Sequence, residues 1–377
     1  ILPSGVADGF EMVCREGKIT EIRSADADRS TAHKIDLGGN YLGPGFVDLH
    51  LHGAKGRDTM EASADAFGAI CDYHASGGTT SLLLTTATAP WSEILHVLEV
   101  ARNLRGDFKQ LAGIHLEGPF LSRQRAGAQR AEFICDPDEQ KIAQLLEFSE
   151  VVKRVTLAPE LPGALDAIEQ LTSAGIAVSA GHSDAWDEEA QAAFGRGLRH
   201  TTHTFNCMSS ARRRGASRVA GLLEFALSEP EIVCELIADG HHVSATLMRM
   251  LYRAKGTAGI CLVTDATAGA GLPENAHFTL AGRECVARQG ACWLADGSAL
   301  AGSAARMIDL VRIAVREIGV PLPEAIGMAT ANPARAAGLA GKGKLEVGCD
   351  ADFVVLSPAL EVLQTFVGQE KIFSAAT

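Results

Sequence analysis

Apolar residues recur in two alternating patterns along the middle of the chain. Short runs of β-branched and other apolar residues, each the length of a strand, alternate with longer segments whose apolar positions have helical spacing. This alternation predicts parallel strands joined by right-handed crossovers. Eight such units are the number that closes a (β/α)8 barrel of the TIM type. The expected strands are residues 45–52, 79–86, 111–117, 155–160, 175–182, 198–205, 232–239 and 259–265. The expected helices are residues 64–75, 91–104, 138–148, 163–174, 187–194 and 245–254.

The two ends of the chain have a different pattern, with short alternating runs separated by glycine turns. Such runs are typical of small antiparallel sheets. We therefore expect residues 1–43 and 340–377 to form one small β-sandwich, and residues 44–339 to form the catalytic barrel. A further pair of strand-like runs follows the eighth expected strand. It predicts a β-hairpin insertion at residues 278–300, close to the mouth of the barrel.

Composition narrows the class of protein. Of the 377 residues, 47% are hydrophobic and 21% are charged, which is typical of a folded globular chain. The 34 basic and 46 acidic residues give a net charge of −12, and only 5% of residues are aromatic, so a nucleic-acid partner is not expected. No apolar run approaches the ~20 residues of a membrane-spanning helix.

The nine cysteines include no C-x-x-C pair, which favours a reducing, cytoplasmic location. The first residues do not resemble a signal peptide and do not begin with Met, so we expect that the true start is missing.

Reactive side chains stand at the ends of the expected strands. The carboxyl ends of the strands share one face of a (β/α)8 barrel, so these groups are expected to converge on a single mouth. They are His50, His52, Glu117, His182, His203, Asp239, His242 and Asp265.

Two groups of these residues suggest metal-assisted hydrolysis. His50 and His52 are two positions apart and share one strand face, so both imidazoles can bind an ion such as Zn(II); a polar strand end that faces solvent is the alternative. Glu117, His182 and His203 together would make a three-ligand site with room for water, although each alone has a structural interpretation, such as a helix-capping acid.

Two further residues of the expected strands have different roles. Asp265 can accept a proton from a water molecule at the metal and return it to a leaving group, unless it only caps a strand end. His115 shares the face of Glu117 but lies deeper, so we interpret it as a residue of the core or one that supports a ligand. A serine hydrolase is disfavoured because the chain has no G-x-S-x-G sequence.

The sequence resembles the amidohydrolase superfamily, and most closely its N-acetylglucosamine-6-phosphate deacetylase family. The resemblance extends from about residue 43 to residue 352. Its matching segments are PGFVD at 44–48, HLEGPFL at 115–121, AGHS at 180–183, THTFNCM at 202–208, IADGHHV at 237–243, VTDA at 263–266, LAGS at 300–303 and ANPA at 331–334.

The resemblance implies a divalent metal, one ion or two, with Zn(II) as the expected element. Glu117, His182 and His203 would hold the first ion, and His50 and His52 a second. The resemblance also implies that Asp265 is the general base and then the acid.

The same resemblance implies a binding site for a substrate phosphate. Asn206, the backbone N–H of Cys207, and His242 would form it. A homodimer is also implied, because the family often supplies a phosphate-binding arginine from the partner subunit.

Two positions depart from the family pattern. The family places a histidine that polarises the acyl carbonyl where this chain has Gln129, and a Gln amide can donate a hydrogen bond but carries no charge. The loss of one such donor would cost ~2.7–4 kcal/mol of transition-state stabilisation if nothing compensates. The family's phosphate arginine lies in an R-E-P-G turn, whereas this chain has RRRGASR at 212–218. Arg214 and Arg218 are the candidates there, and a solvated surface loop is the alternative.

These observations predict metal-dependent deacetylation of N-acetylglucosamine 6-phosphate to glucosamine 6-phosphate and acetate. Because of Gln129 and the 212–218 loop, an amidohydrolase that acts on another N-acyl amino sugar or amide is the alternative within the same chemistry. A sensor that binds a sugar phosphate without catalysis is the alternative of another class. A sensor has no need of Asp265, so the sequence favours an enzyme.

Overall fold

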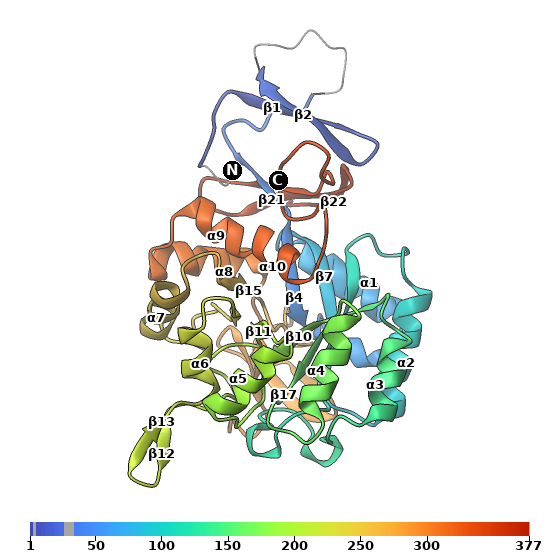
Figure 1. Ribbon diagram of the computed structural model, residues 1–377. Helices are drawn as coiled ribbons and strands as arrows, with labels where there is room; N and C mark the ends of the chain where they lie inside the picture. Colours follow the sequence, from blue (N-terminus) through green and yellow to red (C-terminus); the bar gives the residue numbers. More distant parts are fainter. Residues whose placement is uncertain (3–4, 26–33, 377) are drawn as a thin grey trace.

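A computed structural model describes residues 1–2, 5–25 and 34–376 and shows a barrel of parallel strands surrounded by helices (Figure 1). Its eight-stranded sheet has the order β15-β14-β11-β10-β9-β8-β7-β4, so consecutive strands along the chain are neighbours. The strands are β4 (Phe46–Leu51), β7 (Thr79–Thr86), β8 (Leu111–Glu117), β9 (Val152–Leu157), β10 (Ala177–Ala180), β11 (His200–Thr201), β14 (Val233–Leu236) and β15 (Ile260–Leu262).

The barrel is closed by contacts between β4 and the segment that follows β15. Leu51 and Ala266 form a parallel bridge, and the amide of Asp265 donates to the carbonyl of His50 at 2.8 Å. Deeper in the seam, Oγ1 of Thr264 donates to the buried carboxylate of Asp48 at 2.5 Å. The (β/α)8 fold that the pattern of apolar residues predicts is therefore confirmed.

The helices cover the outside of the barrel, and six of them agree closely with the expected ranges. These six are α1 (Ala64–Ala75), α2 (Trp91–Asn103), α3 (Glu139–Leu146), α4 (Ala164–Ser173), α5 (Asp187–Gly195) and α7 (Ala245–Lys255). The expected set omits α6 (Leu222–Ser228), α8 (Met307–Ile313), α9 (Leu322–Met328) and α10 (Ala331–Ala336). Each of these has six or seven residues, too few for a helical period to be recognised.

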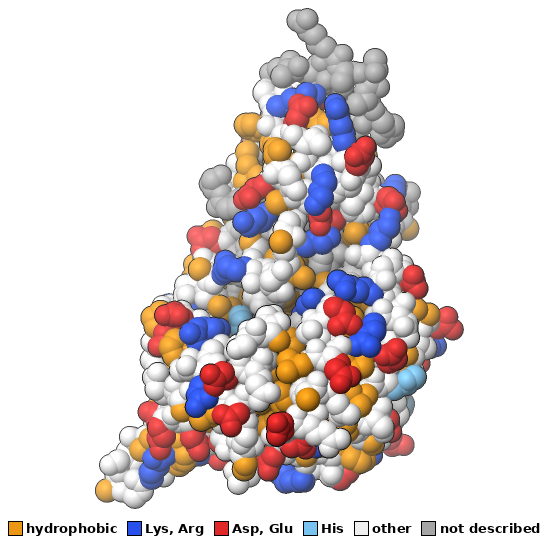
Figure 2. All heavy atoms as spheres, turned by 45° about the vertical axis from the view of Figure 1, so that its right-hand side comes forward, with side chains coloured by type: hydrophobic (Ala, Val, Ile, Leu, Met, Phe, Trp, Pro, Cys, Tyr) orange, Lys and Arg blue, Asp and Glu red, His pale blue; other side chains and the backbone are white. Residues whose placement is uncertain are grey.

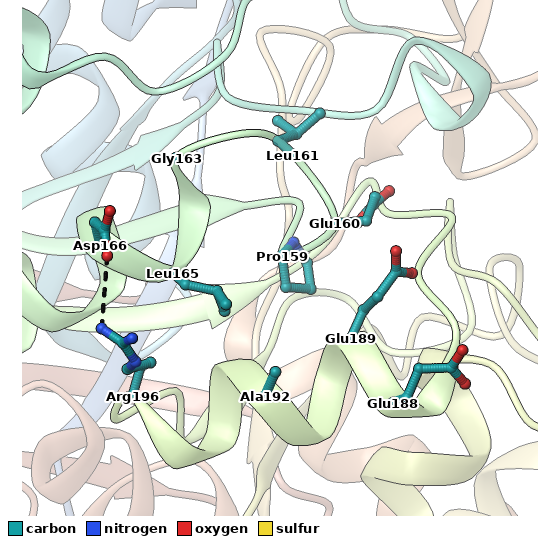
Figure 3. A pocket seen from close by; sticks show the side chains of 10 residues that line it. All are labelled: Pro159, Glu160, Leu161, Gly163, Leu165, Asp166, Glu188, Glu189, Ala192 and Arg196. Atoms are coloured by element: carbon teal, nitrogen blue, oxygen red, sulfur yellow. Dashed lines mark ion pairs between the residues drawn. The ribbon is translucent and has the colours of Figure 1, made fainter.

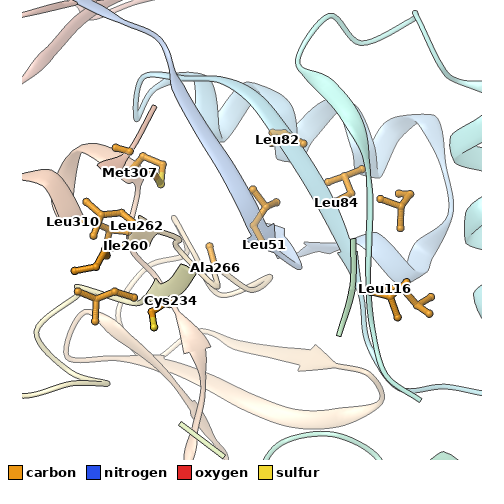
Figure 4. Packing of buried hydrophobic residues seen from close by; sticks show 14 of the residues in the cluster. Leu51, Leu82, Leu84, Leu116, Cys234, Ile260, Leu262, Ala266, Met307 and Leu310 are labelled. Carbon is orange, nitrogen blue, oxygen red and sulfur yellow. The ribbon is translucent and has the colours of Figure 1, made fainter. Parts of the chain in front are cut away.

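Side chains from successive positions of a strand enter different parts of the core. Leu82 and Leu84 are fully buried between the sheet and the surrounding helices, together with Leu51 and Leu116 (Figure 4). Leu83, between them, belongs instead to a small apolar cluster in the barrel interior. That cluster is completed by Val47, Leu49, Ile237, Val263 and Ala334. It fills the barrel beneath the polar residues of the strand ends.

A β-bulge in β4 changes which residues of this strand face inward. In the register with β7, Asp48 pairs with Leu82 and Leu51 pairs with Leu84. Three residue steps along β4 therefore lie opposite two along β7. Such a bulge inserts one residue and re-aims the side chains that follow it. It lets His50 and His52 face the barrel interior although Leu49 also does so.

Two four-stranded antiparallel sheets are attached to the barrel. The first has the order β22-β21-β20-β3 and joins β3 (Tyr41–Pro44) to β20 (Phe353–Leu356), β21 (Val362–Val367) and β22 (Glu370–Ser374). The hairpin of β1 (Phe10–Arg15) and β2 (Lys18–Ser24) lies beyond it (Figure 1). The sheet thus combines segments from both ends of the chain. The boundaries at residues 43/44 and 339/340 stay a prediction.

The second sheet contains the segment expected as a hairpin at residues 278–300. Its four strands are β16 (His277–Leu280), β17 (Arg283–Arg288), β18 (Ala291–Leu294) and β19 (Leu300–Ser303). An interaction between Arg283 and the carbonyl of Gly127, at 3.2 Å, ties it to the loop that follows β8.

Within the described residues, no helix has the length and apolar character needed to cross a membrane. On the face shown in Figure 2, acidic and basic side chains are intermixed.

Candidate metal centre and active site

Glu117, His182 and His203 meet in a tight triangle at the barrel mouth. Nε2 of His203 lies 3.0 Å from Nε2 of His182 and 3.0 Å from Oε1 of Glu117, and Nε2 of His182 lies 3.2 Å from the same oxygen. Ligands at ~2.0 Å around a tetrahedral ion are separated by about 3.3 Å. All three side chains are buried, and the spacing of their atoms fits one divalent ion.

The orientation of His182 supports this assignment. Its Nδ1 donates to the backbone carbonyl of Arg125 at 2.8 Å, which leaves the lone pair of Nε2 directed at the triangle. Histidines that bind metals are commonly held by such a bond from the other ring nitrogen. The ring is therefore oriented before an ion arrives.

A second group lies beside the triangle and consists of His50, His52 and Asp265. Oδ1 of Asp265 is 3.4 Å from Nε2 of each histidine. Glu117 touches this group too, since its Oε2 lies 3.2 Å from Nε2 of His52 and its Oε1 lies 3.5 Å from Nε2 of His50. Nε2 of His50 is buried and has no hydrogen-bond partner. These residues fit a second ion, with Glu117 between the two positions.

The backbone adopts an unusual conformation at three of these residues. His182, His203 and Asp265 have φ values of 45°, 30° and 49°, in the left-handed region that residues other than glycine rarely adopt. Each such residue costs about 1–3 kcal/mol and persists where the surrounding structure enforces it, often at active sites. The sharp turn after each strand directs the side chain toward the barrel axis.

Charges within the cluster determine the protonation of its members. Burial by itself raises the pKa of Asp265, but the neighbouring His50 and His52 outweigh it and hold that pKa below the usual value. Burial likewise lowers the pKa of His52, and its hydrogen bonds to Asp265 and Glu117 reverse the effect and raise it to about 9. Negative carboxylates therefore make this a site that attracts cations, either protons or a metal ion.

Gln129 reaches the metal centre from the loop after β8. Its Nε2 donates to Oε2 of Glu117 at 2.7 Å, and its Oε1 accepts from the backbone amide of Thr88 at 2.7 Å. The side chain is buried and fixed at both ends. An amide nitrogen carries a second N–H, which can donate to a further acceptor.

The residues expected at the phosphate lie around the same mouth. Asn206 and Cys207 follow His203 in one turn, where Nδ2 of Asn206 donates to the His203 carbonyl at 3.2 Å. This turn packs against the Gln129 loop so closely that a Cβ on Gly127 would lie 2.5 Å from Sγ of Cys207.

His242 is held by Asp239, which follows the end of β14. The Asp239 carboxylate accepts from Nδ1 of His242 at 2.8 Å, and also from the backbone amides of His241 and His242. This arrangement keeps a proton on Nδ1. Burial alone lowers the pKa of His242, but the Asp239 carboxylate outweighs it and raises that pKa, so Nε2 can also carry a proton and donate to an anion.

Arg214 and Arg218 are not brought to this cluster. They lie on the exposed hairpin of β12 (Arg212–Arg214) and β13 (Ser217–Val219), which projects from the barrel at the lower left of Figure 1. Arg214 pairs with Glu188 at 2.6 Å, and its guanidinium stacks on the ring of Trp186. Neither arginine reaches the mouth of its own barrel.

A separate surface cavity lies between α4 and α5, and none of the candidate metal ligands lines it (Figure 3). Its charged lining is mainly acidic and includes Glu160, Glu188 and Glu189. Its arginine, Arg196, is paired with Asp166 at 3.5 Å. This electrostatic environment is unfavourable for a phosphate, so the cavity is not a candidate for the substrate site.

Two charged residues beneath the cluster are absent from the sequence-based set. Glu235 of β14 and Arg154 of β9 form a buried ion pair. Glu235 also contacts His50, at 3.1 Å. A signal was present, because Glu235 is a charged residue in the middle of an expected buried strand, where charges are rare unless paired.

Known proteins resemble this chain over nearly its full length. The model of the amidohydrolase family matches residues 41–375. N-acetylglucosamine-6-phosphate deacetylase of Lysinibacillus sphaericus is 34% identical over 96% of this chain and 93% of its own. The enzyme of the same name from Vibrio furnissii is 34% identical over 98% of this chain and 92% of its own. The crystal structure of N-acetylglucosamine-6-phosphate deacetylase from Pasteurella multocida superposes with a TM-score of 0.93 and 33% identity, covering 99% of this chain and 97% of that one.

Proposed function

The chain belongs to the amidohydrolase family, and on that basis we propose that it hydrolyses the acetamide of N-acetylglucosamine 6-phosphate to give glucosamine 6-phosphate and acetate. The observation that carries this proposal is the convergence of Glu117, His182 and His203 within 3.0–3.2 Å of one another, beside Asp265. The relatives named above carry this activity in their names. The names of these relatives favour neither alternative, a hydrolase of a different N-acyl substrate or a sensor without catalysis.

The metal is proposed to be Zn(II), held by Glu117, His182 and His203. Two imidazoles and a carboxylate are the ligands of many catalytic zinc sites. When bound, a divalent ion supplies Lewis acidity that polarises the amide carbonyl and lowers the pKa of water. His50, His52 and Asp265 are proposed to hold a second ion.

The chain's own residues then move the protons. Asp265 is ionised because its pKa is held low, so its carboxylate can accept the proton of the attacking water. The same carboxyl group returns that proton to the nitrogen as the carbon–nitrogen bond breaks. Gln129 is proposed to donate its second N–H to the carbonyl oxygen, where negative charge develops. Water adds to the carbonyl carbon, so acetate and a free amine are the products.

The substrate phosphate is proposed to bind between Asn206, the backbone amide of Cys207, and His242. An exposed arginine of the 212–219 hairpin would complete this site in a second subunit, because the hairpin projects away from its own barrel (Figure 1). We therefore propose a homodimer. We also propose a cytoplasmic location, where a phosphorylated sugar would be available.

Acetate release from the metal-loaded protein tests the proposal. N-acetylglucosamine 6-phosphate, its galactosamine epimer and N-acetylglucosamine without phosphate are compared as substrates. We expect the highest kcat/KM on the first and a large loss when the phosphate is absent. A preference for either of the others would overturn the substrate assignment and keep the hydrolase. Tight binding of all three without turnover would instead favour a sensor.

A further inference from the structure

A buried ion pair crosses the barrel interior beneath the candidate metal centre. Nη2 of Arg154 lies 2.9 Å from Oε1 of Glu235, and both side chains are only 1% exposed. The two residues come from β9 and β14, which are separated in the sheet by β10 and β11. The pair therefore spans the interior of the barrel.

The other oxygen of Glu235 holds two candidate ligands. Oε2 accepts from Nδ1 of His50 at 3.1 Å and from the backbone amide of His203 at 3.0 Å. His203 belongs to the triangle with Glu117, and His50 belongs to the second group. One carboxylate thus contacts both halves of the proposed centre.

Arg154 is connected to a chain of buried hydroxyl groups. Its Nη2 donates to Oγ of Ser179 at 3.0 Å, and Ser179 accepts from Thr202, which in turn contacts Thr156. Thr156 lies 2.7 Å from Nε2 of His115. The ring of His115 packs edge-on against that of His50, with centroids 4.6 Å apart. These contacts hold the His50 ring from a second side.

A further metal at His50, His115 and Glu235 is not supported, although the three are close together. Nδ1 and Nε2 of His115 already contact the Leu49 carbonyl at 3.1 Å and Thr156. The guanidinium of Arg154 occupies Oε1 of Glu235 and would repel a cation. His115, Glu235 and Arg154 therefore support the candidate ligands and do not themselves hold a further ion.

Fold stability alone does not account for the ion pair. Removing two charges from water is costly, and buried pairs are often replaced by apolar residues without loss of stability. A function in orienting the site is therefore the more economical explanation.

We propose that Glu235, held in place by Arg154, is a positioning residue that fixes the His50 ring with Nε2 directed at the metal and anchors the turn that carries His203. This proposal rests on the proposed metal-dependent function. It adds that metal binding requires the buried Arg154–Glu235 pair, although neither residue is itself a proposed ligand. Loss of such supporting contacts commonly lowers metal affinity by about 10–100-fold.

The test replaces both charges at once, with Arg154→Met and Glu235→Met in one protein, so that no unpaired charge is left. We expect the metal-free double variant to keep its folded circular dichroism spectrum. We expect its Zn(II) affinity, measured by competition with a chelator, to fall about 10–100-fold. The visible absorption spectrum of the Co(II)-loaded protein should also change, because it reports ligand geometry.

Gln110→Leu is the matched control. Gln110 is buried and its Nε2 donates to the carbonyls of Cys71 and Thr79, but the residue contacts no candidate ligand. We expect this variant to lose stability and to keep the metal affinity and the Co(II) spectrum of the unmodified protein.

A second variant covers the case in which the double variant does not fold. Glu235→Gln keeps the shape but removes the charge. If its oxygen accepts from His50 and His203, its NH2 group faces the Arg154 guanidinium, and in the opposite orientation both N–H groups lose their acceptor. We expect about a tenfold loss of affinity. We also expect the Co(II) absorption spectrum of this variant to change, because the His50 ring is no longer held by a carboxylate.

Three results would overturn the positioning role. They are an unchanged Zn(II) affinity and Co(II) spectrum in a folded double variant, the same outcome in Glu235→Gln, or an equal loss of affinity in Gln110→Leu. If the unmodified protein bound no divalent ion, the proposed function would fail as well. If it bound the ion and the variants bound it equally well, only the positioning role would fail.

Discussion

The side-chain amide of Gln129 donates a hydrogen bond to Oε2 of Glu117 at 2.7 Å, so the residue that departs from the family pattern touches a proposed metal ligand directly. The same amide is anchored at its other end by the backbone of Thr88. An uncharged donor that is rigidly held can still stabilise a developing negative charge, because it needs no reorganisation during the reaction.

Replacement of Gln129 by Leu should therefore affect both binding and chemistry. We expect kcat to fall by about 10²–10³-fold through the lost donor. We expect metal affinity to fall by about tenfold, because Glu117 loses a partner. Acetate release and chelator competition measure the two effects. Gln124→Leu, at an exposed position of the same loop, is the control and should change neither. Full activity in Gln129→Leu would remove Gln129 from the site.

Replacement of Asp265 by Asn should remove the proton acceptor and keep the size of the side chain. We expect kcat to fall by at least about 10²–10⁴-fold, the usual contribution of a positioned acid or base. The ion held by Glu117, His182 and His203 should remain, as measured by metal analysis of the purified protein. Normal turnover would exclude Asp265 as the base.

Replacement of His52 by Ala should lower the number of bound ions from two to one. His52 contacts Asp265 and Glu117 but lies outside the triangle around the first ion. Metal analysis after equilibration with Zn(II) and gel filtration measures the stoichiometry. His96→Ala, on the exposed face of α2, is the control and should retain two ions. A single ion in the unmodified protein would contradict the two-ion arrangement.

The sequence predicts the barrel and its reactive mouth because both depend on local periodicity and on topology. Strand-length apolar runs such as 79–86 indicate buried parallel strands, and the carboxyl ends of such strands share one face. For this reason His182 and His203, 21 positions apart, could be expected to meet. A helix as short as α6, which has seven residues, is too short for a helical period to be recognised in the sequence.

Other features of the site depend on contacts that sequence patterns do not contain. The bulge between Asp48 and Leu51, which re-aims His50, arises from pairing with β7. The pairing of Arg154 with Glu235 joins strands that are not neighbours in the sheet. The projection of the 212–219 hairpin depends on stacking of Arg212 and Arg214 on Trp186.

Mixed dimers test whether the hairpin serves the partner subunit. Arg218→Ala alone should raise KM for the phosphorylated substrate about tenfold or more while kcat changes little. When it is mixed with Asp265→Asn subunits, each hybrid dimer has one site with both residues intact. Random mixing makes half of the dimers hybrid, so at substrate concentrations well below KM about a quarter of the unmodified activity should return. Arg253→Ala, at an exposed position of α7, should leave KM unchanged when tested alone. No recovery on mixing would contradict a shared site.

Asp350 should make stability depend on pH near the terminal sheet. It pairs with Lys18 at 2.5 Å and with Lys342 at 3.0 Å. Burial alone raises the pKa of Asp350, but these lysines outweigh it and lower that pKa. A lowered pKa means that the ionised form stabilises the fold above the unfolded-state value of ~3.9, and that this stabilisation is lost as the pH falls through the folded-state value.

Asp350→Asn should therefore lower the free energy of unfolding by up to about 1 kcal/mol at pH 7, as expected for a partly exposed pair. The difference from the unmodified protein should be smaller at pH 3, below the unfolded-state value of ~3.9. Urea unfolding at both pH values measures it. Asp107→Asn, at an exposed position in the loop after α2, is the control. An equal deficit at both pH values would show that charge is not the cause.

The left-handed backbone at His182, His203 and Asp265 has a consequence for engineering. Glycine at these positions would relieve steric strain and raise heat resistance, while it would also delete the groups that carry the reaction. A directed-evolution screen that rewards only survival at high temperature would therefore select for inactive variants at this mouth. Libraries for thermostabilisation should hold these three codons constant and place diversity elsewhere in the barrel.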